Sequence, residues 1–158
     1  MLGLIISKIG LLTLVFTLIL AWAKGAPGDR AGATAVAVGW IVALALQPLL
    51  PHDEQLLMLT FVDGALAAAM LVIAIRYSSL WLGIAMLLQG GVLALHSVAL
   101  GGGISARNYF VALNISSFSM LFAIIAATVA SWLHRRREAT RTLAKTAPRP
   151  PVAMAGAA

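Results

Sequence analysis

Residues 59–74 read LTFVDGALAAAMLVIA, an apolar run that is suited to a membrane-spanning helix except for Asp63. A charged side chain at the centre of a bilayer costs about 2.5–3.5 kcal/mol on insertion scales. No basic residue nearby in the sequence can neutralise this carboxylate. The run therefore predicts a helix in which Asp63 faces other helices and not lipid.

The composition of the whole chain indicates a membrane protein. Of its 158 residues, 61% are hydrophobic and 10% are charged. A soluble domain has roughly 45–50% apolar and about 25% charged residues. At this length a single domain is expected. The chain has no cysteine, which excludes disulfides, thiolate metal ligands and cysteine nucleophiles.

Five apolar segments are long enough to span a bilayer, which takes about 20 residues. Polar or Gly/Pro-rich stretches separate them: KGAPGDR, PHDE, RYSS and GGGISAR. Lipid offers no hydrogen-bond partner to exposed backbone, so such segments must be helices. We predict an all-α bundle of five transmembrane helices within a domain of residues 1–134, at about residues 4–23, 31–50, 55–75, 79–100 and 108–133.

The distribution of positive charge predicts the orientation of the bundle. The net charge is +6, and most of it follows the last apolar segment. Lys and Arg favour the cytoplasmic side of a membrane. With the C-terminus inside, five spans also place Lys24, Arg30 and Arg76 inside and leave Lys8 and Arg107 outside. We therefore predict a multi-pass plasma-membrane protein, N-out and C-in, of the bacterial inner-membrane type.

The first segment has a second interpretation, as a signal peptide. LLTLVFTLILAWA follows Lys8, and AWA offers a small-x-small cleavage site of the kind that signal peptidases use. Cleavage would leave four spans and an arginine-rich end outside, against the charge bias. Amphipathic aromatic rings prefer the membrane interface and favour five spans as well. Four aromatic residues of this chain fall at helix ends that the five-span topology places on the cytoplasmic side: Trp22, Tyr77, Trp81 and Trp132.

The tail of residues 135–158 is basic and then rich in Pro and Ala. A segment with so little apolar surface to bury is expected to be disordered. We interpret it as a topology signal, with an alternative role in contacting anionic lipid at about 1 kcal/mol per basic residue. The residues concerned are Arg135, Arg136, Arg137 and Arg141. Because the cluster directly follows an apolar segment, lipid is the expected partner and nucleic acid is not.

Other polar residues are predicted at a depth similar to that of Asp63. The turn after residue 77 is short, so residues equidistant from it pair in height. This places Gln89 slightly toward the cytoplasm from Asp63 and His96 roughly 6 Å outward. Asn114 and Ser117 lie at a similar depth in the last segment. We predict an intramembrane polar cluster of Asp63, Gln89, His96, Asn114 and Ser117.

Small residues accompany Asp63 at a spacing of four. They are Thr60, Gly64 and Ala68. Such a stripe lets helices approach closely, so it is predicted to be the packing surface of this helix. The opposite face, suited to lipid or to bulky neighbours, is assigned to Leu66, Met70 and Ile73.

Two interpretations of the polar cluster lead to different functions. In the first, Asp63 is protonated and the cluster supplies interhelical hydrogen bonds of about 0.6 kcal/mol each. The protein is then a non-catalytic bundle, either an accessory subunit of a membrane assembly or a bundle that associates with itself. In the second, Asp63 and His96 exchange a proton in a small proton-coupled transporter or channel. A holin-like pore former is a lesser variant. A carboxylate without a basic partner favours the first.

No enzymatic activity, metal site or cofactor is predicted. His52, Asp53 and Glu54 are ligand types in sequence, but a helix start with Asp53 as its cap explains them better than a metal centre. The GGGIS loop lacks the preceding strand and the following Lys-Ser/Thr of a phosphate-binding loop. A bis-histidine haem needs two axial ligands, and only His96 lies inside a predicted span.

Overall fold

The computed structural model describes the backbone of residues 2–146 and the side chains of residues 8–51 and 54–142. All regular structure in this range is helical, which confirms the predicted class. The elements are α1 (Leu2–Lys24), α2 (Pro27–Leu46), the 3-10 turn η1 (Gln47–Leu49), α3 (His52–Tyr77), α4 (Leu80–Leu100) and α5 (Ala106–Thr146).

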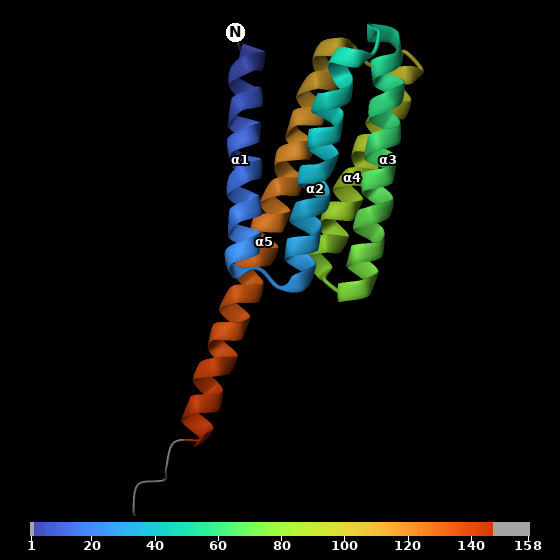
Figure 1. Ribbon diagram of the computed structural model, residues 1–158. Coiled ribbons are helices and arrows are strands. Elements are labelled where there is room, and N and C mark those ends of the chain that lie inside the picture. Colours follow the sequence, from blue (N-terminus) through green and yellow to red (C-terminus); the bar gives the residue numbers. More distant parts are fainter. Residues whose placement is uncertain (1, 147–158) are drawn as a thin grey trace, which may run out of the picture.

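The five α-helices run alternately up and down and form one bundle (Figure 1). Each packs against the next along the chain, and α5 closes the bundle by packing against α1. α2 also contacts α5 across the bundle. The α1–α2 and α3–α4 connections lie at the end from which α5 emerges (Figure 1). We call this the basic end, because it carries Lys24, Arg30, Arg76 and the arginines of residues 135–141.

Four of the helices are long and apolar enough to cross a membrane. Among the described residues these candidate spans are Pro27–Leu49, Glu54–Tyr77, Leu80–Leu100 and Ala106–Thr142. The outward surface is apolar as well: Phe61 is 71% exposed, Leu80 77% and Leu12 70%. A surface of this kind requires an apolar solvent or a partner, which agrees with a lipid environment.

Local sequence explains where α2 begins and ends. Pro27 occupies its first turn, where a missing N–H costs nothing. The Ala26 N–H donates to Asp29 Oδ2 at 2.8 Å, and this buried carboxylate caps the helix. The helix therefore starts before the predicted residue 31. At the other end, Pro48 lies in η1 and Pro51 precedes α3, as expected for residues that disfavour helix continuation.

The tight antiparallel hairpin predicted between the third and fourth segments is confirmed. Ser78 ends α3 in the left-handed conformation, with φ 47° and ψ 40°, and α4 starts at Leu80. At the opposite end of α3, Pro51 holds the N-cap position and His52 begins the helix. The prediction that Asp53 is the cap is therefore wrong, because the helix starts before it.

The prediction of disorder from residue 135 is wrong for residues 135–146, which continue α5. Its 41 residues span about 60 Å, twice the ~30 Å of a bilayer core, and the extension projects beyond the bundle (Figure 1). Arg, Glu, Ala and Lys are good helix formers, and His134 Nδ1 lies 3.4 Å from Glu138 Oε1 one turn later. The predicted lipid-contacting residues Arg135, Arg136, Arg137 and Arg141 are exposed on this extension. The rest of the predicted tail, residues 147–158, lies outside the described residues.

The packing face of α3 differs from the predicted stripe. Leu66 and Met70, assigned to the opposite face, are 6% and 0% exposed, whereas Ala68 is exposed. Four residues turn an α-helix by about 40° more than a full circle, so the row from Thr60 to Ala68 winds away from the buried face. Leu66 and Met70 follow Asp63 by three and seven residues and share its face.

Two glycines of α2 lie directly against side chains of the α3–α4 hairpin. A Cβ atom on Gly28 would lie 2.9 Å from Tyr77 Cβ, and one on Gly32 would lie 2.6 Å from Leu82 Cδ2. A Cβ on Gly64 would meet nothing nearer than Leu93 Cδ2 at 3.9 Å. The spacing of Gly28 and Gly32 is that of the small-xxx-small motif of membrane helix pairs, so α2 supplies this surface against the α3–α4 hairpin.

Candidate functional site

The buried face of α4 places two polar residues inside the bundle. The buried residues follow one another at alternating intervals of three and four: Leu82, Ala85, Gln89, Val92 and His96. This spacing keeps them on one side of a helix. Gln89 is 1% exposed and His96 is 0% exposed. Two side chains that would otherwise prefer water are thus held against α3 and α5.

Both carboxylate oxygens of Asp63 are bound by these residues of α4. Gln89 Nε2 donates to Asp63 Oδ1 at 2.7 Å. His96 Nε2 lies 2.6 Å from Asp63 Oδ2. The side chain of Asp63 is 22% exposed, so the carboxylate is only partly enclosed. His96 is therefore the basic partner of Asp63, and three of the five residues of the predicted cluster meet here.

Tyr109 of α5 extends the network, and sequence reasoning did not include it. Its hydroxyl lies 2.8 Å from His96 Nδ1, and the two ring centroids are 5.8 Å apart. Its depth in the membrane is nevertheless readable from the sequence. His96 lies near the end of α4 and Tyr109 near the start of α5, so the short connection places them at similar depth.

The Asp63–His96–Tyr109 network can exist in two protonation states, and both keep the same two hydrogen bonds. With a neutral imidazole protonated at Nε2, His96 donates to the Asp63 carboxylate and Nδ1 accepts from the Tyr109 hydroxyl. With an added proton at Nδ1, His96 donates to both partners, and the Tyr109 oxygen accepts. The second state pairs a positive imidazolium with the negative carboxylate. Gain of one proton thus changes the net charge of the network from −1 to 0.

A cavity of about 260 Å³ gives access to the Asp63 carboxylate. Side chains from α1, α2, α3 and α5 line it, most of them apolar. Its polar lining residues are Gln47, Asp63, Asn114 and Ser117. Gln47 follows the last residue of α2 at the end of the bundle opposite the basic end. The cavity therefore reaches from Asp63 toward that end, and its polar groups can hold water.

The predicted five-residue cluster is divided into two parts. Asp63, Gln89 and His96 are joined by direct contacts. Asn114 and Ser117 line the cavity on the side of α5, and Asn114 Nδ2 donates to the Phe110 carbonyl of its own helix at 2.7 Å. No three His, Asp or Glu side chains within the described part of the chain are grouped to hold a metal ion.

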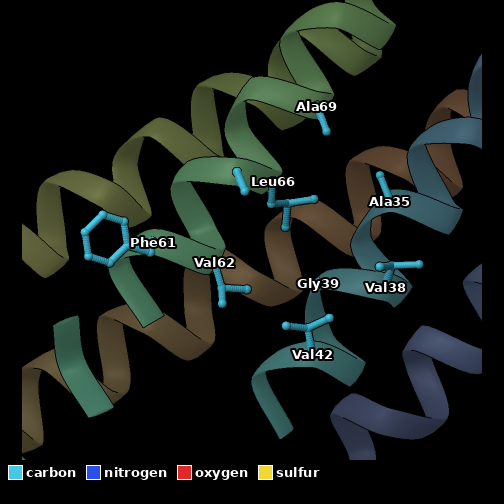
Figure 2. Close-up of a pocket in the computed structure, with 9 residues that line it drawn as sticks. Ala35, Val38, Gly39, Val42, Phe61, Val62, Leu66 and Ala69 are labelled. Atoms are coloured by element: carbon cyan, nitrogen blue, oxygen red, sulfur yellow. The ribbon is translucent and has the colours of Figure 1, made fainter. Parts of the chain in front are cut away.

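A larger groove, of about 480 Å³, lies between α2 and α3 and has a different character. Figure 2 shows the side chains that line it on the two helices, among them Val38, Val42, Phe61 and Leu66. All of its lining residues are apolar. A ligand site usually adds a few polar groups that fix the orientation of the ligand. This groove has none in its lining, so it is suited to contact with apolar groups such as lipid acyl chains.

The fold and the site define a class: a helical bundle with four helices suited to crossing a membrane and an internal Asp–His pair reached by a cavity. Comparisons with protein-family models, with curated proteins and with solved structures find no match for this chain. Its function is therefore argued from the geometry of the site.

Proposed function

We propose that this chain is a small proton-coupled transporter whose proton-binding site is the Asp63–His96 pair. The observation that carries the proposal is the 2.6 Å contact between the Asp63 carboxylate and the buried His96 imidazole. From the sequence, the absence of a basic partner favoured a purely structural cluster. His96 supplies that partner, and its imidazole has one ring nitrogen facing Asp63 and the other facing Tyr109.

The proposed orientation is five spans, N-out and C-in, in a plasma membrane of the bacterial inner type. The charges of the two bundle ends support it. Lys24, Arg30, Arg76 and the arginines of the α5 extension share the basic end, while Arg107 lies at the other. Positive charge favours the cytoplasmic side. The Asp63 cavity then faces outward.

In the proposed mechanism, a proton enters the network from the outer side through the cavity. In the protonated state, His96 donates from Nε2 to the Asp63 carboxylate and from Nδ1 to the Tyr109 oxygen. Neutralising the network removes a net charge from the bundle interior, where charge is unfavourable. The protonated and deprotonated states therefore differ in the stability of the α3–α4–α5 contact, and this difference couples proton binding to movement of these helices.

A flux assay tests the proposal. The purified protein is reconstituted in liposomes that contain a pH-sensitive dye, and an inward proton gradient is applied. We expect faster dissipation than in protein-free liposomes, and loss of the excess rate in Asp63→Asn. Gln89→Leu is the matched control, because it removes a hydrogen bond to the same carboxylate but no titratable group. Unchanged flux in Asp63→Asn, or equal loss in Gln89→Leu, would contradict the proposal.

The second candidate function is that of an accessory subunit or self-associating bundle. It is supported by the completeness of the hydrogen bonding: among the described side chains, every buried nitrogen and oxygen atom has a partner. A satisfied network is also what interhelical stabilisation requires. Purification in mild detergent through a C-terminal tag tests it. Stoichiometric co-purification of another membrane protein, or a stable oligomer, would support this candidate, and a monomer alone would count against it.

A further inference from the structure

A second polar cavity lies at the basic end, where the α1–α2 connection meets α5. Its volume is about 450 Å³. Residues 23–27 form one wall, Arg30 of α2 lies beside them, and Trp132 and Arg135 of α5 close the other side. The cavity is thus built from the α1–α2 connection and from α5, which is distant from it in sequence.

The charge of this cavity is positive and is not offset by its lining. Lys24, Arg30 and Arg135 line it, and none of the lining residues is acidic. The nearest acid in sequence, Asp29, is 2% exposed and accepts a hydrogen bond from the Ala26 N–H. On α5, Glu138 is paired with His134. An anion in the cavity would therefore meet three cations and no competing carboxylate.

Contacts near Trp132 hold two of the three cations, Lys24 and Arg135, in place. The Arg135 guanidinium donates to the Lys24 carbonyl, which ties α5 to the end of α1. The Lys24 ammonium lies 5.9 Å from the Trp132 ring centroid, and the Arg136 guanidinium lies 4.3 Å from it. Cation–π contacts of this kind are attractive within about 6 Å. The cavity is thus preorganised, which lowers the entropy lost when a ligand binds.

We propose that this cavity binds the phosphate headgroup of an anionic phospholipid. Basic pockets between transmembrane helices on the cytoplasmic side suit such headgroups, and Arg offers the planar donors that match phosphate. Lipid is favoured over a free phosphate by the surface next to the cavity. Val129 and Leu133, one turn before and one residue after Trp132, are 38% and 42% exposed. They offer apolar contact to the acyl chains of a lipid whose headgroup occupies the cavity.

This site shares Arg135 with the lipid contact predicted from sequence, but it adds Lys24 and Arg30, which lie outside the tail. Arg137 and Arg141 lie farther along the exposed extension and do not line the cavity. The contributions of the cavity cations and of the extension arginines can be measured separately, because two charges can be removed from either group alone. Lys24→Gln/Arg30→Gln removes two from the cavity, and Arg137→Gln/Arg141→Gln removes two from the extension.

The test counts lipids retained by the intact protein. Full-length protein is reconstituted with an equimolar mixture of phosphatidylcholine and phosphatidylglycerol, extracted in mild detergent and examined by native mass spectrometry. We expect the wild type to retain phosphatidylglycerol. The cavity double variant should bind it about 30-fold more weakly, from about 1 kcal/mol per basic residue at 1.4 kcal/mol per factor of ten. The extension variant should retain it as the wild type does.

Three outcomes would overturn the proposal: equal losses in both double variants, no loss in the cavity variant, or stronger loss in the extension variant. A parallel arm uses nanodiscs of phosphatidylcholine alone and adds inorganic phosphate. A rise in melting temperature with phosphate that matches the rise with phosphatidylglycerol would assign the cavity to a soluble ion instead. Lys24 and Arg30 are exposed, so equal melting temperatures in phosphatidylcholine should show that both variants fold.

Discussion

The interaction between Asp63 and His96 can be measured by a double-mutant cycle with Asp63→Asn, His96→Leu and the double variant. Interhelical hydrogen bonds in membrane proteins average about 0.6 kcal/mol and reach about 1.7. A hydrogen bond to a charged group is worth about 1.5–3 kcal/mol. The two sets of values separate a neutral structural contact from a charge-assisted one.

The structure places this pair in the second range. The two atoms are 2.6 Å apart, and the His96 side chain is 0% exposed. The Asp63 side chain is 22% exposed, so screening keeps the coupling below the value of a fully enclosed ion pair. We expect a coupling free energy of about 2 kcal/mol at neutral pH.

The assay is the free energy of unfolding in mixed micelles, followed by far-UV circular dichroism during titration with a denaturing detergent. A cycle between Asp63→Asn and Asn114→Leu is the control. Asn114 bonds to its own helix at Phe110, so its coupling to Asp63 should be close to zero. A coupling between Asp63 and His96 of about 0.6 kcal/mol or less would refute this reasoning.

Three further predictions concern the helix contacts. Gly28→Ala should lower the free energy of unfolding by about 1–3 kcal/mol, because the new Cβ would overpack against Tyr77. Gly90→Ala is the control: nothing lies within 4 Å of its new Cβ, so the higher helix propensity of Ala should raise the free energy of unfolding by about 0.5–1 kcal/mol. Equal effects of the two substitutions would contradict the proposed α2 packing surface. Ser78→Gly should raise the melting temperature, because glycine adopts a positive φ without steric cost, while Ser79→Gly, at φ −97°, should not. Tyr109→Phe should leave the bundle folded and lower its free energy of unfolding by up to about 1.7 kcal/mol. In the liposome assay it should slow proton flux. Flux at the rate of the unaltered protein would show that Tyr109 is not part of the proton pathway.

Much of the architecture is determined by the sequence alone. Long apolar runs must form helices in lipid because their backbone has no other hydrogen-bond partner. Short connections such as that at Ser78 make neighbouring helices antiparallel. The rise of about 1.5 Å per residue then assigns a depth to every side chain, and it places Gln89 and His96 within about two helical turns of the depth of Asp63.

Only the tertiary structure decides how each helix is rotated about its own axis. In a soluble helix the polar face identifies the outside, but these helices are apolar nearly all round, because lipid accepts the same side chains as the core. Leu66 and Met70 were therefore assigned to the wrong face, and the close contacts of Gly28 and Gly32 were not foreseen. The rotation of α4 and α5 also decides that His96 lies between Asp63 and Tyr109. The depth of a side chain in the membrane follows from the geometry of its own helix. The direction in which it points depends on how that helix packs against the others, which no single segment determines.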